Sequence, residues 1–165
     1  MWEKPLPPGV RSYSRMYVLS NNNVVFGHDN VTVVCDGNLN HINTHTGDYG
    51  RLCGVVHDKL IYCNKSSNDY VLNVYDGNSH QYVCRLPVSV SSDYISTASH
   101  PDSGWFVLTD LGSETMYMFT SDYQLHTQVE LRFRAWRTNG VCCVGELIAV
   151  AGWDEKVIVF YNWAG

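Results

Sequence analysis

Residues 104–122, GWFVLTDLGSETMYMFTSD, hold two apolar runs that are separated by one short polar turn and followed by another. Aromatic residues such as those in WFVL and TMYMF favour β-strands, because flat side chains pack well on a pleated surface. The plan recurs in residues 22–38 (NNVVFGHDNVTVVCDGN), 58–78 (DKLIYCNKSSNDYVLNVYDGN) and 146–163 (ELIAVAGWDEKVIVFYNW). No stretch shows a sustained 3.6-residue apolar period, so helix is expected to be nearly absent. The sequence therefore predicts four β-hairpins.

The four hairpins are parts of a longer repeat. Their second strands end at Cys35, Tyr75, Phe119 and Phe160, which lie 40, 44 and 41 residues apart. Each unit has a further apolar run upstream, and the first three have one downstream. Four strands per repeat of about 40–45 residues are typical of a β-propeller. A β-sandwich is disfavoured because VVFG, LIYC, WFVL and LIAVA are continuous apolar runs, whereas sandwich strands alternate.

The predicted fold is thus an all-β propeller with four four-stranded blades in a single domain. The blades span approximately residues 15–47, 48–90, 91–133 and 134–165, and residues 10–14 are predicted to complete the last blade, which has no downstream strand. Such completion would protect an open sheet edge. Three assemblies remain open: a four-bladed ring, a homodimer that forms an eight-bladed ring, and a piece of a longer propeller. The homodimer is the preferred hypothesis.

Composition narrows the partners and the compartment. Lys and Arg number 11 against 16 acidic residues, which gives a net charge of −5 and disfavours nucleic acid as a partner. The N-terminus has no apolar signal region and no apolar run is long enough to cross a membrane, so no membrane association is expected. The six cysteines lack C-x-x-C spacing and lie largely in strand-like runs, which predicts reduced thiols and a cytoplasmic location.

The sharpest local feature is the segment LRFRAWR at residues 131–137. In an extended chain Arg132, Arg134 and Trp136 share one face. The segment joins the third unit to the fourth, and in a propeller it emerges on the same side as the turn that carries Trp153. The predicted partner-binding residues are Arg132, Arg134, Trp136, Arg137 and Trp153. The alternative is a solvated strand face with Trp136 packed between blades.

Catalytic and metal chemistry find little support. The sequence contains neither a Gly-x-Ser-x-Gly elbow nor a phosphate-binding glycine loop, so no enzyme activity and no cofactor are expected. Four acids fall in equivalent turns, where they could bind a cation or, more commonly, accept hydrogen bonds from turn amides. They are Asp29, Asp110, Asp154 and Glu155. His41 and His45 would lie about 13 Å apart on a strand, too far to chelate one ion.

The third unit, residues 95–131, resembles an NHL-type propeller blade. It has the His-Pro start, an apolar strand ending in Thr-Asp and a short turn bearing glycine. WD-repeat blades are more loosely similar, since no Trp-Asp pair closes any second strand. The resemblance implies a platform that binds protein or RNA. The predicted function is a non-catalytic binding or scaffold module that recognises a protein partner on one mouth. The alternative is a lectin-like propeller with equivalent small-molecule or glycan pockets around the ring.

Overall fold

All regular elements that the structure describes are β-strands. The computed structural model describes residues 5–11, 14–67, 69–110, 112–132, 138–152 and 156–164. The first sheet contains β1 (Arg15–Val18), β2 (Val24–His28), β3 (Val31–Cys35) and β4 (His41–Thr46). The second contains β5 (Arg51–Val56), β6 (Lys59–Ser66), β7 (Asp69–Asp76) and β8 (Tyr82–Val90). The third contains β9 (Ile95–Ser99), β10 (Phe106–Asp110), β11 (Thr115–Phe119) and β12 (Leu125–Glu130). The fourth contains β13 (Thr138–Val144), β14 (Leu147–Gly152) and β15 (Val157–Asn162).

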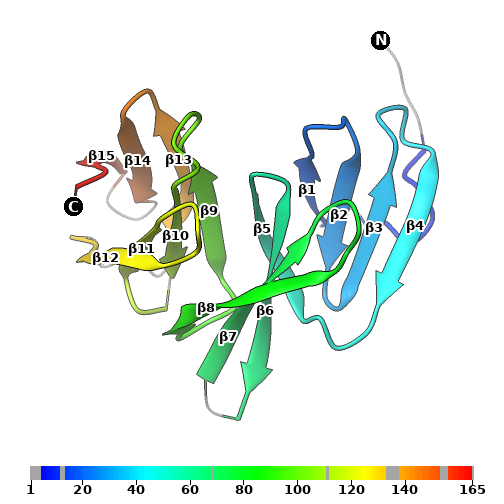
Figure 1. Ribbon diagram of the computed structural model, residues 1–165, viewed down its shortest axis with the longest axis horizontal. Helices are drawn as coiled ribbons and strands as arrows, with labels where there is room; N and C mark the ends of the chain where they lie inside the picture. Colours follow the sequence, from blue (N-terminus) through cyan, green and yellow to red (C-terminus); the bar gives the residue numbers. More distant parts are fainter. Residues whose placement is uncertain are drawn as a thin grey trace.

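Each sheet is an antiparallel meander whose strands follow one another in chain order. The four sheets are arranged along an arc, with the first and the last at its two ends (Figure 1). The first strands of successive sheets lie together on the inner side, since β9 contacts both β5 and β13. This radial arrangement of antiparallel sheets is that of a β-propeller, so the predicted fold class is confirmed.

Burial explains why the hairpin strands were visible in the sequence. Every residue of β2 and of β10 is buried. Neighbouring sheets cover both faces of β10, whereas β2 is covered by the second sheet on one face and by the N-terminal segment on the other. The fourth strands β4 and β12 are mostly exposed and carry polar residues. Side chains such as Ile61, Phe106 and Phe119 fill the space between the second and third sheets. The continuous apolar runs are therefore strands buried on both faces.

Turn chemistry repeats between the third and fourth strands. Asp36 Oδ1 accepts hydrogen bonds from the backbone N–H groups of Asn38 and Asn40, at 2.8 and 2.9 Å. Asp76 Oδ1 accepts from the N–H groups of Asn78 and Ser79, at 3.1 and 2.8 Å. An aspartate that satisfies turn amides in this way favours the hairpin over an extended chain. The predicted hairpin turns are therefore held by their own side chains.

The N-terminal segment lies against the first sheet in this chain. Val10 packs on a buried cluster that includes Phe26 and Val33, and a Cβ placed on Gly9 would lie 3.3 Å from Val33 Cγ2. In the described part of the chain the fourth sheet has three strands, with β15 at its edge. Residues 10, 11 and 14 form no strand against that edge, and residues 12 and 13 lie outside the described ranges. Completion of the last blade by residues 10–14 therefore stays a prediction.

A pair of stacked imidazoles joins the first two sheets. The rings of His45 and His80 lie 3.6 Å apart, centroid to centroid, and are tilted by only 2°. Tyr49 and Tyr62 meet the His80 ring edge-on. Neither ring nitrogen of His80 has a hydrogen-bond partner among the described residues. Burial, and to a lesser extent the neighbouring His45, lower the pKa of His80 to about 4.

Acidification from pH 6.5 to pH 4 is expected to destabilise the protein through His80. In this range the unfolded chain binds a proton at this histidine before the folded chain does, so stability is lost as the pH falls. We expect a loss on the order of 1 kcal/mol, less than full burial would give, because water reaches part of the ring. Urea unfolding at pH 7 and pH 4.5 measures it. His80→Phe should flatten the dependence, and exposed His126→Phe should not; equal slopes in all three proteins would contradict this origin.

Candidate functional site: a charged cleft on the mouth

The antiparallel meander sorts the loops onto two faces of the arc. The turns between second and third strands and the connections from one sheet to the next lie on one face, called the mouth here. The remaining turns, which include those of Asp36 and Asp76, lie on the opposite face. Arg15 stands near the mouth on the inner side, where its Nη1 donates to the carbonyl oxygens of Cys53 and Ile95 at 3.0 and 2.7 Å. This arginine links the inner strands of the first three sheets.

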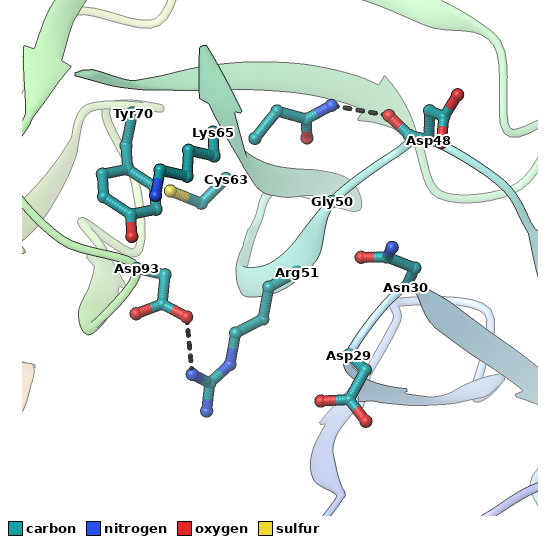
Figure 2. A pocket seen from close by; sticks show the side chains of 10 residues that line it. Asp29, Asn30, Asp48, Gly50, Arg51, Cys63, Lys65, Tyr70 and Asp93 are labelled. Atoms are coloured by element: carbon teal, nitrogen blue, oxygen red, sulfur yellow. Dashed lines mark hydrogen bonds and ion pairs between the residues drawn. The ribbon is translucent and has the colours of Figure 1, made fainter. Parts of the chain in front are cut away.

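A cleft of about 480 Å³ opens on the mouth between the first two sheets. Figure 2 shows its lining: Asp29 and Asn30 on one side, Arg51 in the middle, and Lys65, Tyr70 and Asp93 on the other. These residues come from a second-to-third-strand turn, from the start of β5, from the β6–β7 hairpin and from the β8–β9 connection. Loops from two neighbouring sheets therefore build one concave surface.

Arg51 occupies the centre of the cleft. Its Nη1 donates to Asp93 Oδ2 at 2.9 Å, and about a third of each of the two side chains is exposed to solvent. The guanidinium also lies 5.4 Å from the centroid of the Tyr94 ring, a favourable cation–π position. Two contacts thus hold a charged, planar hydrogen-bond donor at the surface, where it can bind a carbonyl or carboxylate of another molecule.

The wall beside Arg51 is fixed by a close backbone approach. Asn64 Nδ2 donates to the backbone carbonyl oxygen of Asp48 at 2.6 Å. Gly50 has φ of +83°, and a Cβ there would lie 2.0 Å from Asn64 Oδ1. Only glycine suits this position, because an L side chain would meet both the unfavourable backbone conformation and Asn64. The connection from β4 to β5 is therefore held against the second sheet.

The cleft carries charges of both signs. Asp29 and Asp48 are exposed on the side of the first sheet, while Lys65 is exposed on the β6–β7 side. The Cys63 thiol is buried at the base. The neighbouring Cys53 thiol and burial both raise the pKa of Cys63 above its ordinary value, so it stays protonated. The arrangement suits charged and hydrogen-bonded contacts rather than nucleophilic chemistry.

Asp110 has a structural place close to the mouth. It is fully buried and accepts hydrogen bonds from the Ser91 and Gly112 N–H groups at 2.7 and 3.0 Å. The hydroxyl groups of Ser91, Ser92 and Ser113 donate to it as well, at 3.0, 3.1 and 2.7 Å. Among the acids predicted in equivalent turns, Asp110 thus holds turn amides and hydroxyls, and Asp29 borders the cleft. Asp154 and Glu155 lie outside the described residues. In the described ranges no three His, Cys, Asp or Glu side chains form a metal-binding group.

The predicted Arg–Trp patch falls largely beyond what the structure describes. Arg132 is exposed and directly follows Leu131, which is buried against the fourth sheet. Arg134, Trp136, Arg137 and Trp153 lie outside the described residues, so the patch stays a prediction. The cleft itself was missed in the sequence, because Arg51 and Asp93 are 42 residues apart and neither belongs to a motif. The available signal was that Arg51 and Asp93 both lie where the chain enters a new sheet, at the start of β5 and just before β9.

The radial antiparallel sheets, with loops from consecutive sheets gathered on one face, define the structure as a β-propeller. The WD40 domain of Neurospora crassa Pan2 aligns with 84% of this chain at 9% sequence identity, with a TM-score of 0.61, and 43% of that chain is covered. The structure of U3-55K aligns with 89% of this chain at 8% identity, with a TM-score of 0.59 and 50% of that chain covered. The chain thus spans about half the length of these structures. No family model matches the sequence, and no curated protein matches it significantly.

These likenesses concern the fold alone, since the identities are below a tenth. A propeller positions loops from consecutive sheets on one face, which is how surfaces such as the cleft arise. In the parts of the chain that the structure describes, no helix is long and apolar enough to cross a membrane.

Proposed function

We propose that the protein is a non-catalytic binding module that recognises a protein partner on the mouth. The observation that carries the proposal is the cleft between the first two sheets, with the Arg51–Asp93 pair at its centre. A partly exposed arginine held over a tyrosine is the type of residue that dominates protein interfaces. The five residues of the predicted Arg–Trp patch would extend this surface toward the fourth sheet.

A protein suits the cleft better than RNA or a glycan. Asp29, Asp48 and Asp93 outnumber Arg51 and Lys65, and the whole chain carries a net charge of −5. Phosphates would be repelled by this balance, whereas a polypeptide can offer charges of both signs. Tyr70 is the aromatic ring of the lining, and a sugar site would use more aromatic surface. Ionisable groups are thus the main recognition elements.

Two matched ion pairs allow a sharp test of the mouth. Arg51–Asp93 lies on the mouth with side chains 34% and 33% exposed, and Lys59–Asp76 lies on the opposite face with side chains 27% and 26% exposed. A partner is first captured from a cell extract, and the Kd of its complex is then measured. Arg51→Ala is expected to raise this Kd about tenfold, as for loss of a central charged contact. Lys59→Ala should leave the Kd unchanged.

The comparison is fair because both substitutions remove one partly exposed ion pair. Each should change stability by less than about 1 kcal/mol. An equal loss of binding in both variants would indicate a general effect of charge or folding. Loss with Lys59→Ala alone would place the partner on the opposite face and overturn the proposal.

We also propose a cytoplasmic location and closer kinship of the blades to the NHL type. All six cysteines are free thiols, which suits a reducing compartment. His100-Pro101 and Thr109-Asp110 in the third sheet support the NHL comparison. Titration of the denatured, freshly purified protein with a thiol reagent is expected to find six groups. Four or fewer would contradict the reduced state and the compartment.

A further inference from the structure

Apolar side chains are exposed at the two ends of the arc. The described residues include thirteen large hydrophobic side chains that are exposed to solvent, and seven of these lie on the outward faces of the first and last sheets or on the segment beside them. They are Leu6, Met16, Val18, Val144, Leu147, Ile158 and Phe160. A soluble chain seldom gathers exposed apolar groups in this way unless another surface covers them.

The last sheet presents a continuous apolar face. Ile158 and Phe160 are 62% and 54% exposed, and they alternate along β15 with Val159 and Tyr161, which pack toward the third sheet. The register pairs Phe160 with Ala149 and Ile158 with Ala151, so these residues share the outward face. In the three preceding sheets the corresponding strands are covered by a following sheet (Figure 1). The outward face of the fourth sheet therefore resembles the faces that are covered by a neighbouring sheet in the other blades.

Leu147 and Val144 continue this face toward the inner strand. They are directly opposite each other in the ladder between β13 and β14, and both are exposed. Directly opposite residues of an antiparallel pair project to the same side of a sheet. The apolar face thus runs across all three strands of the sheet and is wide enough to receive another sheet.

The first sheet is covered on its outward face only in part. Residues 5–11 lie over its middle strands, where Val10 packs on Phe26 and Val33. Met16 and Val18 of β1 remain 61% exposed, and Leu6 of the covering segment is exposed too. The two ends of the arc thus carry two different apolar surfaces, which is the requirement for head-to-tail association.

We propose that the outward face of the last sheet docks onto the first sheet and the N-terminal segment of a second copy of this chain. The matching propellers are about twice as long as this chain. Two copies of four sheets give eight, the upper end of the range of about four to eight in propellers. A two-fold axis through the centre of the ring then relates the two copies. The same head-to-tail junction forms twice, and both end sheets of each copy are covered. The proposal does not depend on the partner at the mouth.

The junction also gives residues 5–11 a role. The segment covers Val33 of β3, the third strand of its sheet, and the exposed β15 is the third strand of the last sheet. When two blades stack, third strand faces third strand. The N-terminal segment of one copy therefore packs between β3 of its own first sheet and the outward face of β15 of the other copy.

Mass in solution tests the proposal. Light scattering after gel filtration is expected to give twice the chain mass of 18.7 kDa for the wild type at about 50 μM. Phe160→Asp on one surface and Met16→Asp on the other should each give single chains. Leu125→Asp, on the exposed face of β12, is the matched control and should stay paired. Circular dichroism checks that each variant is folded, and Ile158→Lys replaces Phe160→Asp if that variant is not.

Mixing the two interface variants separates head-to-tail pairing from other dimers. A Met16→Asp copy keeps its last sheet and a Phe160→Asp copy keeps its first, so together they restore one of two junctions and should pair at raised concentration. A wild type of single-chain mass would overturn the proposal. A Met16→Asp variant that stays fully paired, or a mixture that never pairs, would also overturn it.

Discussion

Replacing Asp110 by alanine is expected to lower the free energy of unfolding by about 3 kcal/mol, because hydrogen bonds to a buried charged group are lost. The carboxylate is fully buried and accepts five hydrogen bonds from Ser91, Ser92, Gly112 and Ser113. Alanine would leave these donors without their shared acceptor, and water can reach only the part of the site where Ser91, Gly112 and Ser113 are exposed. The substitution would also release the β8–β9 connection from the turn between β10 and β11. Urea unfolding followed by tryptophan fluorescence measures the change.

Asp69→Ala is the matched control for this experiment. Asp69 is exposed at the start of β7, so its loss should change stability by less than about 0.5 kcal/mol. A loss below about 1 kcal/mol for Asp110→Ala would show that its hydrogen bonds are replaced by water.

The second large effect is expected from Leu108→Ala, which should destabilise the protein by about 3 kcal/mol. Leu108 has no exposed surface and lies in the cluster between the second and third sheets, together with Ile61, Phe106 and Phe119. Removing three buried carbon atoms loses their transfer free energy and leaves a cavity, because the surrounding side chains of two packed sheets can close the gap only in part. Urea unfolding reports the loss directly.

Leu125→Ala makes the same chemical change on β12, where the side chain is exposed. It should shift stability by less than about 0.5 kcal/mol. If the two leucine variants were equally stable, the space between the second and third sheets would not be the packed core that the propeller requires.

The hairpins could be predicted from the sequence because local chemistry decides them. Asp36 and Asp76 satisfy turn amides within their own hairpins, and residues such as Phe106 in β10 are buried on both faces. Both effects act within one repeat and therefore leave a pattern in neighbouring residues. The repeat then fixed the radial arrangement, because strands buried on both faces need a sheet on either side.

Contacts between repeats left no such pattern. Arg51 and Asp93 meet across 42 residues, and His45 stacks on His80 across 35, through side chains that are ordinary in their own strands. The sequence predicts Val10 in a closing strand because it shows that the fourth sheet has an open edge. It does not show that the N-terminal segment packs on the face of the first sheet. The packing of Val10 on Phe26 and Val33 depends on the exact stagger of two sheets. Sites of this kind become visible only once the sheets are placed.

The account's central claim, recognition of a protein partner on the mouth, is tested most directly by hydrogen–deuterium exchange of the protein with and without the captured partner. The prediction is slower exchange at residues 29–30, 47–51 and 91–94, which line or border the cleft, and unchanged exchange at residues 36–40 and 120–124 on the opposite face. Slower exchange at the opposite turns, with the cleft residues unaffected, would contradict the claim.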